Sequence, residues 1–102
     1  MADFLDILAK NAQENIKEGY YSDILKIDSK KISLRKAIIE EKKTPIITEI
    51  KAASPSAGII RRITKPEEIA QKMEKGGAIA ISVLTEPNYF KGSLTSPSKI
   101  KE

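Results

Sequence analysis

Two opposite charges lie on one face of an otherwise apolar segment. Residues 46–52 read Ile-Ile-Thr-Glu-Ile-Lys-Ala. Successive side chains of a strand point to opposite faces, so Glu49 and Lys51 point the same way, roughly 6.5–7 Å apart along the strand. Charges directed toward a core cost free energy unless they pair or bind a ligand. The pair is therefore the first candidate for chemistry, with a purely structural ion pair as the alternative.

Polar loops follow both apolar segments that we expect to be strands. Ser54-Pro55-Ser56 follows the first, and residues 85–93, which include Phe90, follow the second. In parallel sheets and barrels, ligands bind at the carboxyl ends of the strands, so these loops and the charged pair should share one edge. Taken alone, Ser54 is more often part of an ordinary turn, and Phe90 more often packs in a core.

The residues before and between the two apolar segments have apolar side chains at helical spacing. One helix is expected over residues 2–18, with Leu5, Leu8, Ala12 and Ile16 on its apolar stripe. A second is expected from a Ser33 cap to about Lys42. A third should begin at a capping box that opens with Thr64, bury Ile69, Ala70 and Met73, and end after Lys75 at Gly76-Gly77.

The second predicted strand, residues 78–84, is apolar on both faces, which is typical of a parallel strand covered on both sides. Strand, helix and strand together predict a βαβ unit, which is right-handed in nearly all proteins. Ser96-Pro97 is expected to begin another helix. The fold class is α/β.

Composition narrows the chemistry. The chain has 102 residues, 40% hydrophobic and 31% charged, which suits one small globular domain. Cysteine and histidine are absent, which removes disulfides, thiolates and the commonest metal ligands, and we expect no metal and no cofactor.

No apolar run reaches the roughly 20 residues of a membrane span, and the acidic N-terminus lacks a signal pattern, so a cytoplasmic protein is expected. The net charge of +4 is spread along the chain, which argues against nucleic acid as a partner.

Two motifs resemble indole-3-glycerol phosphate synthases. They are Glu-Ile-Lys-Ala-Ala-Ser-Pro-Ser-Ala-Gly from Glu49, and Gly-Gly-Ala-Ile-Ala-Ile-Ser-Val-Leu-Thr-Glu-Pro-Asn-Tyr-Phe-Lys-Gly-Ser from Gly76. The resemblance implies a (β/α)₈ TIM barrel, with residues 1–44 as an N-terminal helical extension and 45–102 as the first two βα modules of an incomplete barrel. It also implies a lyase of tryptophan biosynthesis. This enzyme closes the indole ring of carboxyphenylamino-deoxyribulose phosphate with loss of CO₂ and water.

The resemblance assigns roles to four residues. Glu49 and Lys51 would be catalytic residues: Lys51 would also contact the anionic substrate, and Glu49 would belong to the polar active-site network. Ser54 would help to hold the substrate carboxylate, and Phe90 would form part of the wall around its aromatic ring. Ala57 departs from the family, whose members often have a basic residue there, and the alanines at 52 and 53 replace residues that are commonly basic or polar.

The resemblance also implies that these 102 residues lack the family's general acid, general base and phosphate-binding loops. The family's general-acid lysine lies on the third strand, its general base on a later one, and its phosphate-binding loops near the end of a barrel of about 250 residues. We therefore expect the 102-residue chain to be inactive alone, to expose sheet edges, and to associate with the remainder of a barrel or with itself. The alternative is a non-enzymatic βαβ module that binds an anionic small molecule or a protein partner; a weaker one is nucleic-acid binding.

Overall fold

The computed structural model describes residues 3–22 and 31–101, and the chain divides into two compact units, Met1–Lys30 and Lys31–Glu102. The first unit contains helix α1 (Phe4–Lys17), which confirms the first predicted helix. Asp3 caps it, since its carboxylate accepts a hydrogen bond from the Asp6 amide at 2.9 Å. Two residues of the predicted apolar stripe, Leu5 and Ile16, are 75% and 69% exposed.

Helix α2 (Leu34–Glu40) begins the second unit, and Ser33 caps it as predicted, with its Oγ 3.1 Å from the Lys36 amide nitrogen. The helix ends at Glu40 rather than near Lys42. Glu41 is extended, and its carboxylate accepts the Lys43 N–H at 3.1 Å. This local bond competes with the helical one that the same amide would donate.

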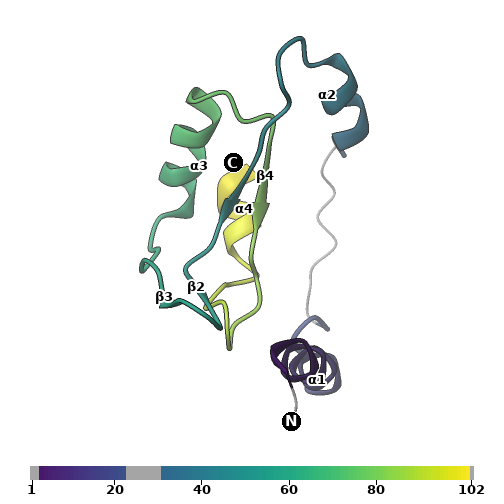
Figure 1. The fold of residues 1–102 in the computed structure, drawn as a ribbon, viewed down its shortest axis with the longest axis vertical. Helices are drawn as coiled ribbons and strands as arrows, with labels where there is room; N and C mark the ends of the chain where they lie inside the picture. Colours follow the sequence, from purple (N-terminus) through teal and green to yellow (C-terminus); the bar gives the residue numbers. More distant parts are fainter. Residues whose placement is uncertain (1–2, 23–30, 102) are drawn as a thin grey trace. The chain divides into compact units, whose positions relative to one another are not determined.

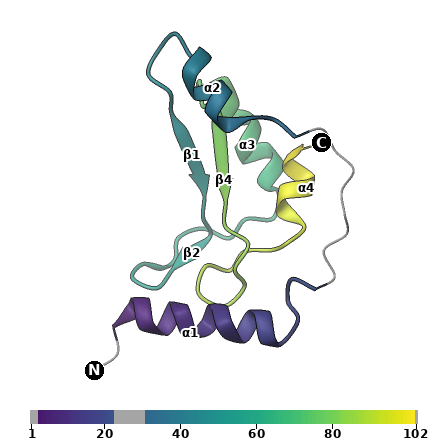
Figure 2. The same ribbon diagram turned by 90° about the vertical axis from the view of Figure 1, so that its right-hand side faces the viewer.

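Strands β1 (Ile47–Ile50) and β4 (Ala80–Val83) form a parallel two-stranded sheet, which confirms the predicted pairing. Glu49 is aligned with Ser82, so these two residues share a face, while Ile50 and its partner Val83 share the other. Figure 2 shows the two strands side by side.

A short antiparallel hairpin follows β1 and is absent from the sequence-based predictions. It pairs β2 (Ala53–Ser54) with β3 (Gly58–Ile59). Its turn requires a left-handed residue, and Gly58, with φ of +64°, supplies it. The hairpin turns the chain at Ala53, so the first strand is shorter than residues 46–52.

Helix α3 (Pro66–Lys75) connects β1 and β4 and packs against both, with α4 (Ser96–Lys101) beside it (Figure 1). The predicted capping box is wrong: the cap residue is Lys65, not Thr64, and no side chain caps the helix. Lys65 precedes Pro66, which disfavours a helical conformation at Lys65, so Lys65 itself takes the cap position. Gly77, with φ of +106°, ends the helix region as expected.

The core is small. Among the described residues, the buried apolar side chains are Ile50, Ala53, Pro66 and Ala70. The predicted partners of Ala70 on α3, Ile69 and Met73, are half-buried. Strand β4 is not covered on both faces as predicted, since Ser82 is exposed and its apolar residues are half-buried. Its sheet has only two strands, which leave the Glu49 face open within this unit. No helix in the described ranges is long and apolar enough to cross a membrane.

Candidate functional site

Glu49 and Lys51 form an ion pair where β1 ends. Nζ of Lys51 lies 2.9 Å from Oε1 of Glu49, and the side chains are 36% and 42% exposed. Ser82 on the neighbouring strand donates its hydroxyl to Oε2 of Glu49 at 3.4 Å. The strand alternation that predicted a shared face is confirmed, and the structure adds Ser82 to the pair.

This geometry leaves the ammonium able to bind an anion. An ammonium has three donors, and among the described residues Glu49 engages one of them. Both carboxylate oxygens of Glu49 are engaged, one by Lys51 and one by Ser82. Glu49 therefore holds Lys51 in place at a half-open edge, where an incoming carboxylate or phosphate could share its charge.

Ser54 lies in the hairpin directly after this edge. Its Oγ accepts the Ala57 N–H at 3.1 Å and lies 3.5 Å from Oγ of Ser56. Because Oγ is the acceptor for Ala57, its own proton can be donated to Ser56 or to a ligand. Within the described residues no hydrogen bond joins Ser54 to Glu49 or Lys51, so the structure places it beside the pair along the chain without bonding it to them.

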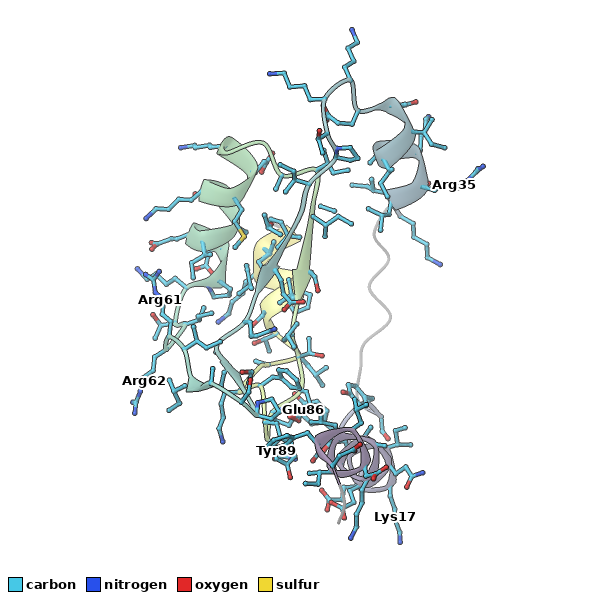
Figure 3. The ribbon with its side chains drawn as sticks, in the orientation of Figure 1. Lys17, Arg35, Arg61, Arg62, Glu86 and Tyr89 are labelled. Carbon is cyan, nitrogen blue, oxygen red and sulfur yellow. The ribbon has the colours of Figure 1, made fainter. Side chains whose placement is uncertain are left out.

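The loop after β4 is organised by Glu86, which sequence reasoning missed. Its carboxylate accepts backbone N–H groups from Asn88 at 2.8 Å, Tyr89 at 2.6 Å and Phe90 at 3.4 Å. Figure 3 shows Glu86 and Tyr89 side by side in this loop. Phe90, predicted to be a wall residue, is half-buried, and its backbone is fixed by this carboxylate.

A glycine closes the same loop against the end of β4. The Gly92 amide donates to the Glu86 carbonyl at 2.8 Å. A Cβ at this position would lie 2.1 Å from the carbonyl oxygen of Leu84, well inside contact distance. The preceding residue, Lys91, has φ of +53°, a left-handed conformation that non-glycine residues seldom adopt.

One feature of the sequence could have indicated that Glu86 binds the backbone of this loop. An acidic side chain that accepts N–H groups two and three residues later resembles a helix cap or an Asx turn. Aspartate, asparagine, serine and threonine usually take that role, so a glutamate followed by Pro87 gave only a weak cue.

A mainly apolar cavity lies elsewhere in the described part of the chain. Its volume is about 380 Å³, and its lining comes mainly from β4 and α4, including Ile81, Val83, Pro97 and Ile100. Neither Glu49 nor Lys51 contributes to it. It is mainly apolar, without the convergent polar groups of the carboxyl edge.

Comparison with known proteins identifies the family. A family model described as indole-3-glycerol phosphate synthase matches residues 5–102. The chain belongs to the indole-3-glycerol phosphate synthase family. The match includes β1, β4 and both loops, and it confirms the resemblance carried by the two motifs.

Individual relatives agree. Proteins named indole-3-glycerol phosphate synthase from Campylobacter hominis and Methanocaldococcus jannaschii are 41% identical over 107 residues and 51% identical over 80. These alignments cover 95% and 72% of the chain, but 41% and 30% of the relatives. A third such protein, from Carboxydothermus hydrogenoformans, is 54% identical over 65 residues, which cover 61% of the chain and 25% of that relative. The chain thus spans less than half the length of these synthases.

Proposed function

We propose that residues 45–102 form the substrate-binding edge of an indole-3-glycerol phosphate synthase, as two βα modules of a (β/α)₈ barrel. The observation that carries this proposal is the 2.9 Å pair of Glu49 and Lys51 at the carboxyl end of β1, in a chain of this family. The substrate class is an anionic aromatic sugar phosphate, and the pathway is tryptophan biosynthesis in the cytoplasm.

Lys51 supplies the charge that attracts the substrate. Its ammonium is held by Glu49, and its side chain is about one-third exposed, so an anion can approach without first breaking the pair. Ser82 fixes the second oxygen of Glu49, which limits rotation of the carboxylate. Preorganisation of this kind reduces the entropy lost on binding.

Ser54 and Phe90 complete the proposed contacts. The Ser54 hydroxyl can donate to the substrate carboxylate, because its oxygen already accepts the Ala57 amide. Phe90 offers a flat apolar surface to the substrate's aromatic ring. Glu86 holds the backbone of Phe90 and so positions this ring indirectly.

Ring closure requires proton transfers that this edge does not supply. Decarboxylation and dehydration need a donor and an acceptor at separate atoms of the substrate. Glu49 and Lys51 neutralise each other at 2.9 Å, which suits binding and positioning better than proton transfer. We therefore propose that the 102-residue chain alone binds the substrate without converting it.

A binding titration tests the proposal. The chain is titrated with carboxyphenylamino-deoxyribulose phosphate, and binding is followed by calorimetry. Lys51→Ala should weaken binding about tenfold or more, because a charge-assisted contact contributes ~1.5–3 kcal/mol. Lys36→Ala is the matched control, since Lys36 is also an ion-paired lysine, 3.9 Å from Glu40 on α2.

Two results would contradict the proposal. Equal affinity for wild type and Lys51→Ala would remove the role of the pair. Formation of indole-3-glycerol phosphate by the purified chain at the rate of a full-length synthase would disprove the claim that it only binds.

A further inference from the structure

A second concentration of positive charge lies at the start of α3. A cavity of about 160 Å³ is lined there by Arg61, Arg62, Lys65 and Lys72, with Glu68 as its single carboxylate. We call it the basic cavity. Neither Glu49 nor Lys51 lines it, so it is distinct from the ion pair proposed to bind the synthase substrate.

Most of this charge is not neutralised within the protein. Lys65 pairs with Glu68 at 3.7 Å, and both side chains are largely exposed, so the pair is weak. Among the residues that the structure describes, Arg61, Arg62 and Lys72 form no ion pair. Three cations therefore line this cavity without an ion-pair partner among the described residues.

The backbone beneath the basic cavity is fixed. The amides of Ile60 and Arg61 both donate to the Ala52 carbonyl, at 2.8 and 3.1 Å, which attaches the connector to the end of β1. No side chain caps α3 at Lys65, so the positive end of the helix dipole adds to the field of the cations. Figure 3 shows Arg61 and Arg62 projecting from this connector, and Arg35 on α2.

The size of the basic cavity selects a small ligand. Drug-sized ligands usually occupy about 300–1,000 Å³, and this cavity has about half the lower value. Arginine presents paired N–H donors that match the oxygens of phosphate. A phosphate group fits both the size and the charge.

An adjoining cavity offers space for the rest of the molecule. It has a volume of about 270 Å³ and shares Arg61, Arg62 and Ile63 with the basic cavity. Its other walls are Ala52, Ile59 and Lys91, so apolar and aliphatic surface predominates. A ligand with a phosphate at one end and a small apolar body at the other would fill both cavities.

We propose that the basic cavity binds the phosphate of a small phosphate monoester, whose organic part lies in the adjoining apolar cavity. Arg61 and Arg62 contact the phosphate from the connector, and Lys72 contacts it from α3. Free inorganic phosphate carries the same charged group without the organic part, so the two ligands can be distinguished by experiment.

Amide chemical shifts of the ¹⁵N-labelled chain provide the first test. The chain is titrated with phenyl phosphate and with inorganic phosphate, against sodium chloride of equal ionic strength. Shifts should concentrate in residues 61–72, and phenyl phosphate should bind more tightly. Arg62→Gln and Lys72→Gln should each weaken binding about tenfold. Arg35→Gln removes the same charge on α2 and should leave affinity unchanged.

Chemical modification of the unaltered chain gives an independent test. Arg35, Arg61 and Arg62 are its three arginines, and all are exposed. Phenyl phosphate should slow phenylglyoxal modification of Arg61 and Arg62 but not of Arg35, as mapped by mass spectrometry.

Equal protection of all three arginines, or protection of none, would overturn the proposal. Amide chemical-shift changes that sodium chloride reproduces would also overturn it. Equal affinity for phenyl and inorganic phosphate would overturn the role of the apolar cavity. None of these results depends on Lys51.

Discussion

Two glutamates organise the carboxyl edge in different ways. Glu49 binds side chains, with Lys51 on one oxygen and Ser82 on the other. Glu86 binds backbone, accepting three N–H groups of its own loop. The first glutamate positions a charge for a ligand, and the second fixes the loop that presents Phe90. Hydrogen bonds to an ionised carboxylate are stronger than those to a neutral acceptor.

Removal of the Glu86 carboxylate should loosen this loop. Glu86→Ala leaves three backbone donors without their acceptor, and we expect the free energy of unfolding to fall by roughly 1–3 kcal/mol. Glu86→Gln keeps one acceptor oxygen and should lose less. Urea titration followed by circular dichroism measures both. Glu74→Ala, at an exposed site on α3, is the control and should change stability by less than about 0.5 kcal/mol. A loss no greater than the control's would show that Glu86 does not hold the loop.

The two glutamates also show what the sequence could predict at this scale. Strand alternation requires Glu49 and Lys51 to share a face, so their pairing followed from spacing alone. The contacts of Glu86 depend on a loop conformation that has no periodicity. Ser82 was missed for a related reason: its contact with Glu49 depends on the register between two strands 33 residues apart.

At the scale of elements, the loops after β1 and β4 depend on glycines in different ways. Gly58 needs a left-handed backbone, but a Cβ there would meet nothing within 4 Å. Gly92 lies against the backbone of Leu84 and Thr85, where a Cβ has no room. Gly76 has neither constraint, since its nearest contacts would be at 3.4 Å. Substitution at these three positions therefore distinguishes the free-energy cost of a left-handed backbone from the cost of a steric clash.

Alanine substitutions should rank these costs. Gly92→Ala should be the most harmful, because backbone must move to relieve the clash, and we expect a loss of more than about 2 kcal/mol. Gly58→Ala should cost about 1–2 kcal/mol for a left-handed alanine. Gly76→Ala should be neutral or slightly stabilising, by up to about 1 kcal/mol, because alanine restricts the unfolded chain. Thermal unfolding of the three variants gives the order. Equal effects at Gly92 and Gly76 would refute the close packing at the end of β4.

The sequence predicts the presence of the helices and strands better than the residues at which they begin and end. Apolar runs and turn residues gave the helices and the parallel strands, because burial fixes both patterns. The β2–β3 hairpin was missed because each of its strands has only two residues, too few to show alternation. The Thr64 capping box failed because Lys65, which precedes Pro66, stays non-helical and takes the cap position itself.

At the scale of the whole molecule, apolar surface exceeds what the core can bury. Only four apolar residues are buried among those described, while Ile46, just before β1, and Ile47, its first residue, are 51% and 52% exposed. A sheet of two strands is marginally stable unless other elements cover it. Exposed apolar side chains beside an open sheet favour association.

We expect the purified chain to self-associate as its concentration rises. Burial of a half-exposed isoleucine recovers about 1 kcal/mol, so several such contacts can hold two copies together. Sedimentation velocity across a concentration series measures the association. The double variant Ile46→Thr, Ile47→Thr should shift the equilibrium toward monomer, whereas Ile32→Thr, at a site that is 82% exposed and precedes α2, should shift it less. A monomer at every concentration, with one sharp unfolding transition, would show that the sheet is stable without a partner.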